Sequence, residues 1–240
     1  MKISEMKREE LAERLILSVL NAEESNERLF NFPNIIKGGF ALVSQLCLGD
    51  KNIDGQYTSC ITVTNDILNG WDISKFEMFD LAIQNSRSLF PVLVEPLDSM
   101  TGVLSGSEKG LFHTDGVNLP NCYILTNKGF FNGAAALFYE PDVLNRLSKK
   151  CRADNIYLFP SSTNHIFCIP SSNLLSKEEC TELQSALFSE SEEKPLFDKI
   201  MVYDNTDSMV LFDDRKFALS LNEVSGRSIS QDFQTKGIHR

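Results

Sequence analysis

The sequence predicts an α+β protein with a mainly antiparallel sheet, helices packed on one face, an N-terminal helix and a loose C-terminal tail. Its 240 residues are 42% hydrophobic and 23% charged, an ordinary globular composition. Strand-like runs come in pairs, and single segments with helical periodicity separate the pairs. Turn residues join several of the paired runs, as antiparallel connections require.

The chain begins with a predicted helix over residues 4–20, in which apolar residues recur at helical spacing after a suitable N-cap serine. Residues 35–48 and 57–65 follow as β-rich runs separated by turn residues, which predicts a hairpin. Gly38-Gly39 marks a bend or bulge within the first run.

Ser74-Lys75-Phe76-Glu77 has the S-x-x-E pattern of a capping box and predicts a helix to about Ser88. Residues 96–121 then contain four glycines and little periodicity. They predict a long loop or insertion, which is the place in this chain for a lid or a domain boundary.

The second half of the chain has a regular order of paired strands and single helices. We expect a polar tail after it, because residues 222–240 contain few core-forming side chains. The predicted elements are strands at 122–126 and 133–139, a helix from Pro141 to Lys150, strands at 155–159 and 164–169, a helix from a second capping box at Ser176 to Ser189, and a hairpin of 199–203 with 208–212.

These elements predict one compact domain with four segments. The segments are a helix, hairpin and capped helix at 1–95, a loop or insertion at 96–121, a region of paired strands and helices at 122–214, and a polar tail at 215–240.

Charge and residue usage exclude several classes of function. The balance of 23 basic and 33 acidic residues, a net of −10, argues against direct nucleic-acid binding. No apolar run is long enough for a secretion signal or a membrane span, which predicts a cytoplasmic protein that does not bind membranes. The six cysteines form no CxxC motif, and three histidines are too few for a histidine-rich site. We therefore expect buried structural cysteines, no metal and no cofactor.

The most unusual polar run is Pro160-Ser161-Ser162-Thr163-Asn164-His165, between two apolar strands. One interpretation is a tight turn whose side chains bond to nearby backbone groups. The other is a polar site in which His165 is the acid or base and Ser161 or Ser162 is a donor or nucleophile. Ser162 and His165 are the candidate catalytic residues.

A second polar group, Thr126-Asn127 with Asn132-Gly133, flanks the turn after strand 122–126. The simpler interpretation is again turn chemistry, because asparagine and glycine tolerate positive φ angles. If strands 122–126 and 155–159 are neighbours, Asn127 and Ser161 leave the same edge of the sheet, and the two groups merge. The predicted binding residues are Thr126, Asn127, Asn132, Gly133, Ser161, Ser162, Asn164 and His165.

The runs CYILTNKGFFNGAAALFYEPDVLNRL and NIYLFPSSTNHIFCIP, with ITVTNDILNGWDISKFEMFDLAIQNSRSLFP upstream, resemble a bacterial family with a domain of unknown function. The similarity covers roughly residues 40–212. The resemblance implies a fold and a bacterial or mobile-element setting, without a reaction. That family usually has histidine-glutamate where this chain has Asn164-His165, and this departure favours a divergent binding protein.

Three functional hypotheses follow. The first is a cytosolic, non-catalytic binding protein with a protein partner. The second is a small hydrolase or transferase that uses Ser161 or Ser162 with His165, helped by Asn127. The third is an acidic inhibitor that mimics nucleic acid toward a basic partner groove. The sequence leaves the oligomeric state open.

The negative charge is concentrated in residues 176–214, where eleven acidic residues outnumber three basic ones. A solvated helix face with acidic turns is the simpler interpretation. The alternative is a surface for a basic partner. Its predicted residues are Glu178, Glu179, Glu182, Glu190, Glu192 and Glu193.

Overall fold

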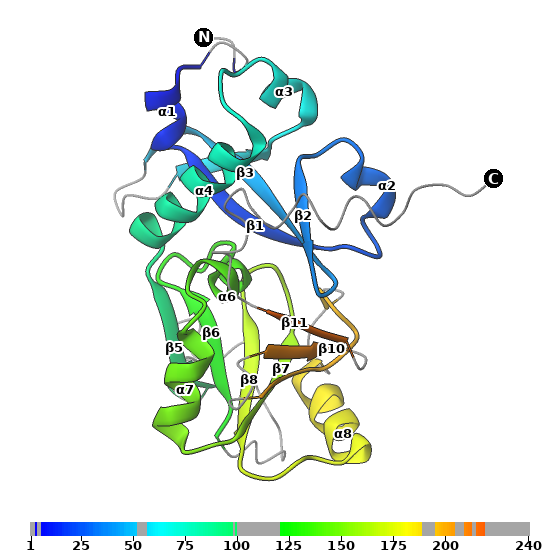
Figure 1. Cartoon of the computed structure of the whole chain (residues 1–240). Helices are drawn as coiled ribbons and strands as arrows, with labels where there is room; N and C mark the ends of the chain where they lie inside the picture. Colours follow the sequence, from blue (N-terminus) through cyan, green and yellow to red (C-terminus); the bar gives the residue numbers. More distant parts are fainter. Residues whose placement is uncertain are drawn as a thin grey trace, which may run out of the picture.

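The computed structural model describes residue 3 and residues 6–51, 57–97, 99, 121–188, 195–204, 209–212 and 215–218. It is the α+β protein that the sequence predicts, with antiparallel strands in two sheets. Figure 1 shows the four-stranded sheet in the upper half and the seven-stranded sheet in the lower half. The predicted loop at 96–121 lies outside the described residues, apart from residues 96, 97, 99 and 121, and so do residues 219–240 of the predicted tail. Residues 215–218, which the sequence analysis assigned to the tail, instead form a strand that pairs with residues 209–212.

The first sheet and its helices come from residues before position 90. The elements are α1 (Arg8–Ala12), β1 (Leu15–Asn21), α2 (Asn26–Leu29), β2 (Asn34–Lys37), β3 (Phe40–Lys51), β4 (Tyr57–Thr62), α3 (Asn65–Asn69) and α4 (Lys75–Leu89).

The second sheet and its helices follow. The elements are β5 (Val92–Pro96), β6 (Tyr123–Asn127), the 3₁₀ helix η2 (Gly133–Ala135), α6 (Ala136–Tyr139), α7 (Val143–Cys151), β7 (Asn155–Pro160), β8 (Ile166–Ser171), α8 (Lys177–Phe188), β9 (Met201–Asp204), β10 (Met209–Phe212) and β11 (Arg215–Ala218).

The helix predicted over residues 4–20 is wrong for most of its length. Only α1 is helical, and the chain becomes strand β1 at Leu15. Leu11, Leu15 and Val19 recur every four residues, a spacing that keeps side chains on one face of a helix but also on one face of a strand. Because β1 is buried on both faces, its sequence lacks the alternation of a half-exposed strand.

Strand β3 is the centre of the first sheet. β1 pairs with one side of it, while β2 and β4 pair with successive parts of the other side. The predicted hairpin is the β3–β4 pair. The expected bend at Gly38-Gly39 is itself a two-residue hairpin turn between β2 and β3, with φ angles of 56° and 99° that favour glycine.

Helix α4 begins at the predicted capping box and closes the outer edge of β1. Ser74 Oγ accepts the Glu77 backbone N–H at 3.2 Å, and Glu77 accepts the Ser74 N–H at 3.0 Å. Near its other end, Ser86 Oγ accepts the Leu17 N–H at 2.8 Å. Asn85 donates to the Leu15 carbonyl at 3.0 Å, so side chains of α4 satisfy backbone groups that β3 does not reach.

The seven strands of the second sheet lie in the order β11-β10-β9-β7-β8-β6-β5. The predicted hairpin of 199–203 with 208–212 is the β9–β10 pair. α7 packs Leu144 against one face of the sheet, and α8 packs Leu187 against the other. The sequence predicted helices on one face, but the central strands are apolar on both faces and both must be covered.

The strand predicted at 133–139 is wrong, because this run is the 3₁₀ helix η2 followed by α6. Every residue from Gly133 to Tyr139 is buried. A short apolar run buried on all sides carries no period, and its three alanines favour a helix.

One hydrophobic core extends through both sheets. It includes Leu17 and Phe40 of the first sheet, Leu158 of the second, and Phe138 of α6. The Phe40 ring packs edge-on against Phe138, with ring centroids 5.1 Å apart. Figure 1 shows α6 where the two sheets meet, so this helix fills the space between them.

Candidate functional site

The two predicted polar groups do meet, although by a different route from the one expected. β6 and β7 are not neighbours, because β8 lies between them and pairs antiparallel with both. β6 and β7 therefore run parallel to each other, and their carboxyl ends reach the same edge of the sheet. Asn127 and Ser161 leave that edge on either side of the start of β8.

Thr126 and Asn127 are buried and committed to local structure. Thr126 Oγ1 donates to the Asn164 carbonyl at 2.7 Å, which ties the end of β6 to the turn before β8. The Asn127 amide donates to the Phe131 carbonyl at 2.8 Å and accepts from the Gly129 N–H at 3.0 Å. Asn127 thus holds the turn after β6 closed from the inside.

Asn132 is the residue that connects this edge to the first sheet. Its φ of 52° is in the left-handed region, which asparagine adopts more readily than most residues. Its Oδ1 accepts from Ser18 Oγ at 2.8 Å, and its Nδ2 donates to Gln45 Oε1 at 2.8 Å. Its backbone N–H donates to Asn164 Oδ1 at 3.1 Å. One side chain therefore binds β1 and β3 while its backbone binds the turn before β8.

Gly133 packs against the same turn. A Cβ atom at this position would overlap the Asn164 carbonyl oxygen and the Thr126 hydroxyl. Glycine is needed here because two backbone segments approach closely. The φ angle of Gly133 is not in the left-handed region, so backbone conformation does not require glycine.

The polar run before β8 forms a closed turn. Ser162 Oγ lies 3.1 Å from His165 Nδ1 and accepts the Asn164 N–H at 3.1 Å. The Ser162 N–H donates to the His165 carbonyl at 3.3 Å. Ser161 is buried, and its carbonyl accepts the Leu196 N–H at 3.1 Å. Of this run, Asn164 is exposed and Ser162, Thr163 and His165 are half-buried.

Burial lowers the pKa of His165 from 6.5 to about 4. The imidazole stacks edge-on against Phe167, with ring centroids 5.2 Å apart, in surroundings that disfavour its charged form. His165 is therefore neutral at pH 7. A general base works best with a pKa near the operating pH, so this histidine is a weak base for Ser162.

The predicted acidic surface is described only over α8. Glu178, Glu179 and Glu182 are exposed there, whereas Glu190, Glu192 and Glu193 lie outside the described residues. Glu179 accepts the Ser176 N–H at 2.7 Å in the predicted capping box, and this hydrogen bond lowers the pKa of Glu179. Glu178 and Glu182, one helical turn apart, are the side chains on α8 whose carboxylates point to solvent without this capping role.

Sequence reasoning missed several participants. Ser18 and Gln45 complete the Asn132 network, but they lie 114 and 87 positions away from it. Cys47 and Cys60 face each other across β3 and β4, with Sγ atoms 2.6 Å apart, and the predicted hairpin was a signal that could have paired them. Surface pockets of the described residues lie elsewhere, among them one between β5 and α7 and one beside α2 and α3.

Within the described residues, no group of three or more His, Cys, Asp or Glu side chains is placed to hold a metal ion. Among the same residues, no helix is both long and apolar enough to cross a membrane.

A family model described as a family of unknown function matches residues 2–204 of the chain. The chain belongs to the DUF5688 family. This confirms the resemblance that the sequence motifs carry. No curated protein and no solved structure matches this DUF5688 member. The DUF5688 match ends at Asp204, the last residue of β9.

Proposed function

We propose that this DUF5688 member is a non-catalytic interaction protein. The observation that carries the proposal is the closed turn at 162–165. There the Ser162 hydroxyl accepts the backbone N–H of Asn164, and His165 beside it is a weak base. The remaining predicted site residues support the same view, because Thr126, Asn127 and Asn132 are buried in bonds that hold the fold.

The runner-up function is a small hydrolase or transferase. The 3.1 Å contact between Ser162 Oγ and His165 Nδ1 favours it, since a nucleophile and its base must lie within hydrogen-bond reach. The two functions make opposite predictions for one pair of variants. Ser162→Ala and His165→Ala abolish the activity of an enzyme and leave the affinity of an interaction protein for its partner within about twofold.

The proposed partner is a protein with a basic surface that meets the exposed carboxylates of α8. Support comes from Glu178 and Glu182, which are exposed one turn apart on that helix, and from the chain's net charge of −10. The abundance of cysteine without a disulfide supports the cytosol as the compartment, and the family resemblance supports a bacterial or mobile-element setting. An inhibitor that mimics nucleic acid would use the same acidic surface.

The test begins with affinity capture from cells, followed by binding measurements on the purified partner. We expect Glu178→Lys with Glu182→Lys to weaken binding at least tenfold and to reduce its dependence on salt. The matched control is Asp72→Lys with Asp80→Lys, which makes the same change in net charge at two exposed positions near α4. Equal loss of binding in both double variants, or binding that salt does not affect, would count against the α8 surface. Turnover of a substrate that disappears with Ser162→Ala would replace the proposal by the enzyme hypothesis.

A further inference from the structure

Strand β5 is one edge of the seven-stranded sheet, and the chain leaves part of its backbone facing outward. The Lys128 N–H donates to the Pro91 carbonyl, and the Leu97 N–H donates to the Cys122 carbonyl. Residues 91, 93, 95 and 97 therefore direct their backbone groups toward β6, because bonding direction alternates along an antiparallel strand. Val92 and Val94, between them, direct both N–H and C=O groups away from the sheet.

The edge strands of the two sheets differ in whether their outward backbone groups have hydrogen-bond partners. At the outer edge of β1, Ser86 and Asn85 of α4 bond to the outward backbone groups. At β5, no other strand in the described part of the chain pairs with the outer side. All five β5 residues are partly exposed. Figure 1 shows β5 at the margin of the lower sheet, with α7 beside it.

A pocket lies along this edge. It has a volume of about 220 Å³ and is lined by Val92 and Val94 of β5 and by Val143, Arg146, Leu147 and Lys150 of α7. Pockets for small molecules usually measure about 300–1,000 Å³, so this one is better suited to individual side chains. The valines that offer the outward backbone groups also line the pocket, so one extended segment can use both.

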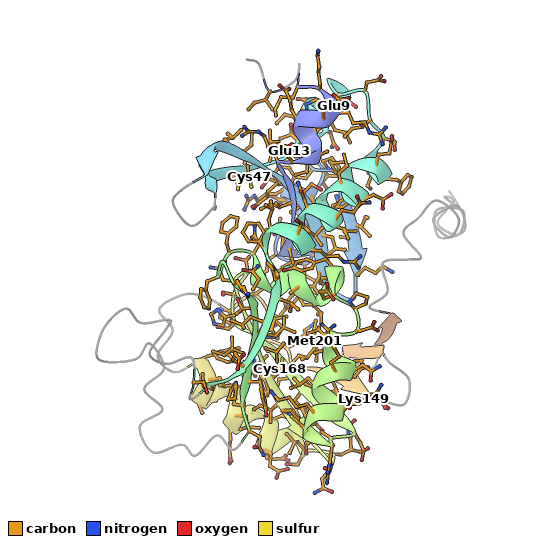
Figure 2. All side chains as sticks on the ribbon, turned by 90° about the vertical axis from the view of Figure 1, so that its left-hand side faces the viewer. Glu9, Glu13, Cys47, Lys149, Cys168 and Met201 are labelled. Carbon is orange, nitrogen blue, oxygen red and sulfur yellow. The ribbon has the colours of Figure 1, made fainter. Side chains whose placement is uncertain are left out.

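The rim of the pocket is basic. Lys150 is exposed, and its Nζ lies 5.4 Å from the centroid of the Tyr123 ring. Arg146 is also exposed and lies 3.6 Å from Glu140. Figure 2, which views the molecule from the left of Figure 1, labels Lys149 on the same helix. An extended segment in the pocket therefore meets apolar walls and two cations, one of which, Arg146, is ion-paired with Glu140.

We propose that β5 is a docking edge for an extended protein segment that adds a strand to the sheet and carries acidic and apolar side chains in turn along one of its faces. Backbone bonds to Val92 and Val94 supply affinity, and the α7 pocket selects the side chains. A second copy of this chain is disfavoured as the occupant, because a two-fold pairing of β5 strands would bring Arg146 and Lys150 of both copies together. This docking edge is separate from the α8 surface, so it does not depend on the proposed function.

The probe is a fluorescent peptide, acetyl-Thr-Asp-Thr-Val-Thr-Asp-Thr-amide, and fluorescence anisotropy with the full chain measures its binding. Its central valine fits the pocket, and the aspartates on the same face approach the two cations. We expect the peptide to bind at least tenfold more tightly than the same peptide with lysines in place of aspartates. N-methylation of its central valine should weaken binding at least tenfold, since this removes a backbone donor without changing the protein.

Two protein variants test the same site. Val94→Pro removes an outward N–H that no strand in the described part of the chain pairs with, and we expect at least tenfold weaker binding with an unchanged circular dichroism spectrum. Lys150→Glu should weaken binding about fivefold, while Lys149→Glu, its exposed neighbour outside the pocket lining, should have less than a twofold effect.

The inference is overturned if the acidic and lysine peptides bind equally, or if the N-methylated peptide binds as well as the parent. Equal effects of Lys150→Glu and Lys149→Glu would also overturn it. So would a dimer in analytical ultracentrifugation that Val94→Pro dissociates, because a second copy would then occupy the edge.

Discussion

Asn132 shows how much of the candidate site consists of structural residues. Its side chain bonds to Ser18 and Gln45, and its backbone bonds to Asn164. All three contacts span long distances in the chain, so the pattern Asn132-Gly133 could predict a turn but not its partners. The structure brings Asn127 and Ser161 to one edge of the sheet, as the sequence analysis expected for neighbouring strands, although β8 lies between the two strands. The sequence could not tell that buried amides here join two sheets, because that depends on the packing of α6 between them.

Gly133 is the position where we expect an added methyl group to lower the stability of the fold most. Gly133→Ala places a Cβ against the Asn164 carbonyl and the Thr126 hydroxyl, and the turn must move to admit it. We expect the free energy of unfolding to fall by about 2–3 kcal/mol, measured by urea denaturation. Gly70→Ala is the control, because Gly70 is exposed with a φ of −81° and should change stability by less than about 1 kcal/mol. Equal effects of the two changes would contradict the close packing at Gly133.

His165 should make stability depend on pH. Its folded pKa of about 4 is below the ordinary value of 6.5, so between these values the unfolded chain binds a proton that the folded chain does not. The free energy of unfolding should therefore fall as the pH drops from 6.5 to 4. Below pH 4 this group should cause no further decrease. The contribution is about 3 kcal/mol at most.

The measurement compares wild type with His165→Gln at several pH values. The difference in free energy of unfolding between the two proteins should change across this window. Carboxylates elsewhere titrate in both proteins, so their effect cancels in the difference. Parallel stability curves between pH 4 and 7 would show that His165 titrates normally in the folded protein.

At the scale of elements, the β3–β4 hairpin brings together Cys47 and Cys60, which the sequence analysis expected to be buried structural cysteines without a redox role. The Cys47 N–H bonds to the Arg14 carbonyl on the β1 side, so Cys47 and Cys60 form a pair without backbone bonds between them. Cα atoms in such pairs lie about 4.5 Å apart, within the range for a disulfide. The Cys47 thiol also lowers the pKa of Cys60 by hydrogen bonding, which favours its thiolate.

We expect oxidised glutathione to join Cys47 and Cys60. The two thiols lose two protons and two electrons, and the oxidant becomes two molecules of glutathione. Mass spectrometry should show the loss of two hydrogens and a linked peptide pair under non-reducing conditions. Cys60→Ser should abolish the link, whereas Cys180→Ser, on α8, should not. A linked pair that contains any other cysteine would contradict this pairing.

The errors at element scale have one physical origin. Residues 15–21 and 133–139 are apolar runs buried on all sides, so neither carries the period that separates helix from strand. Ser74 and Ser176 were identified correctly because a capping box is local and satisfies the amides beside it. Prediction therefore succeeded where the partners are neighbours in sequence.

At the scale of the whole molecule, the two sheets should unfold together. They share one core, in which Phe40 of β3 packs on both Phe138 and Phe197. Trp71, the single tryptophan, is buried beside the first sheet and reports on it by fluorescence. Hydrogen exchange of β7 and β8 reports on the second. We expect the two probes to give the same urea midpoint, and separate midpoints would show that the halves fold independently.

The proline that ends β5 limits what this edge can recruit. Pro96 has no N–H, so after Val92 and Val94 the strand offers no third outward donor. Growth of a fibre requires a long, regular row of donors and acceptors on which chain after chain can stack. An edge with two donors can bind a short segment of a partner, but it is too short to template the continued addition of chains to a fibre. The protein can therefore keep an accessible strand in a crowded cell at little risk of aggregation.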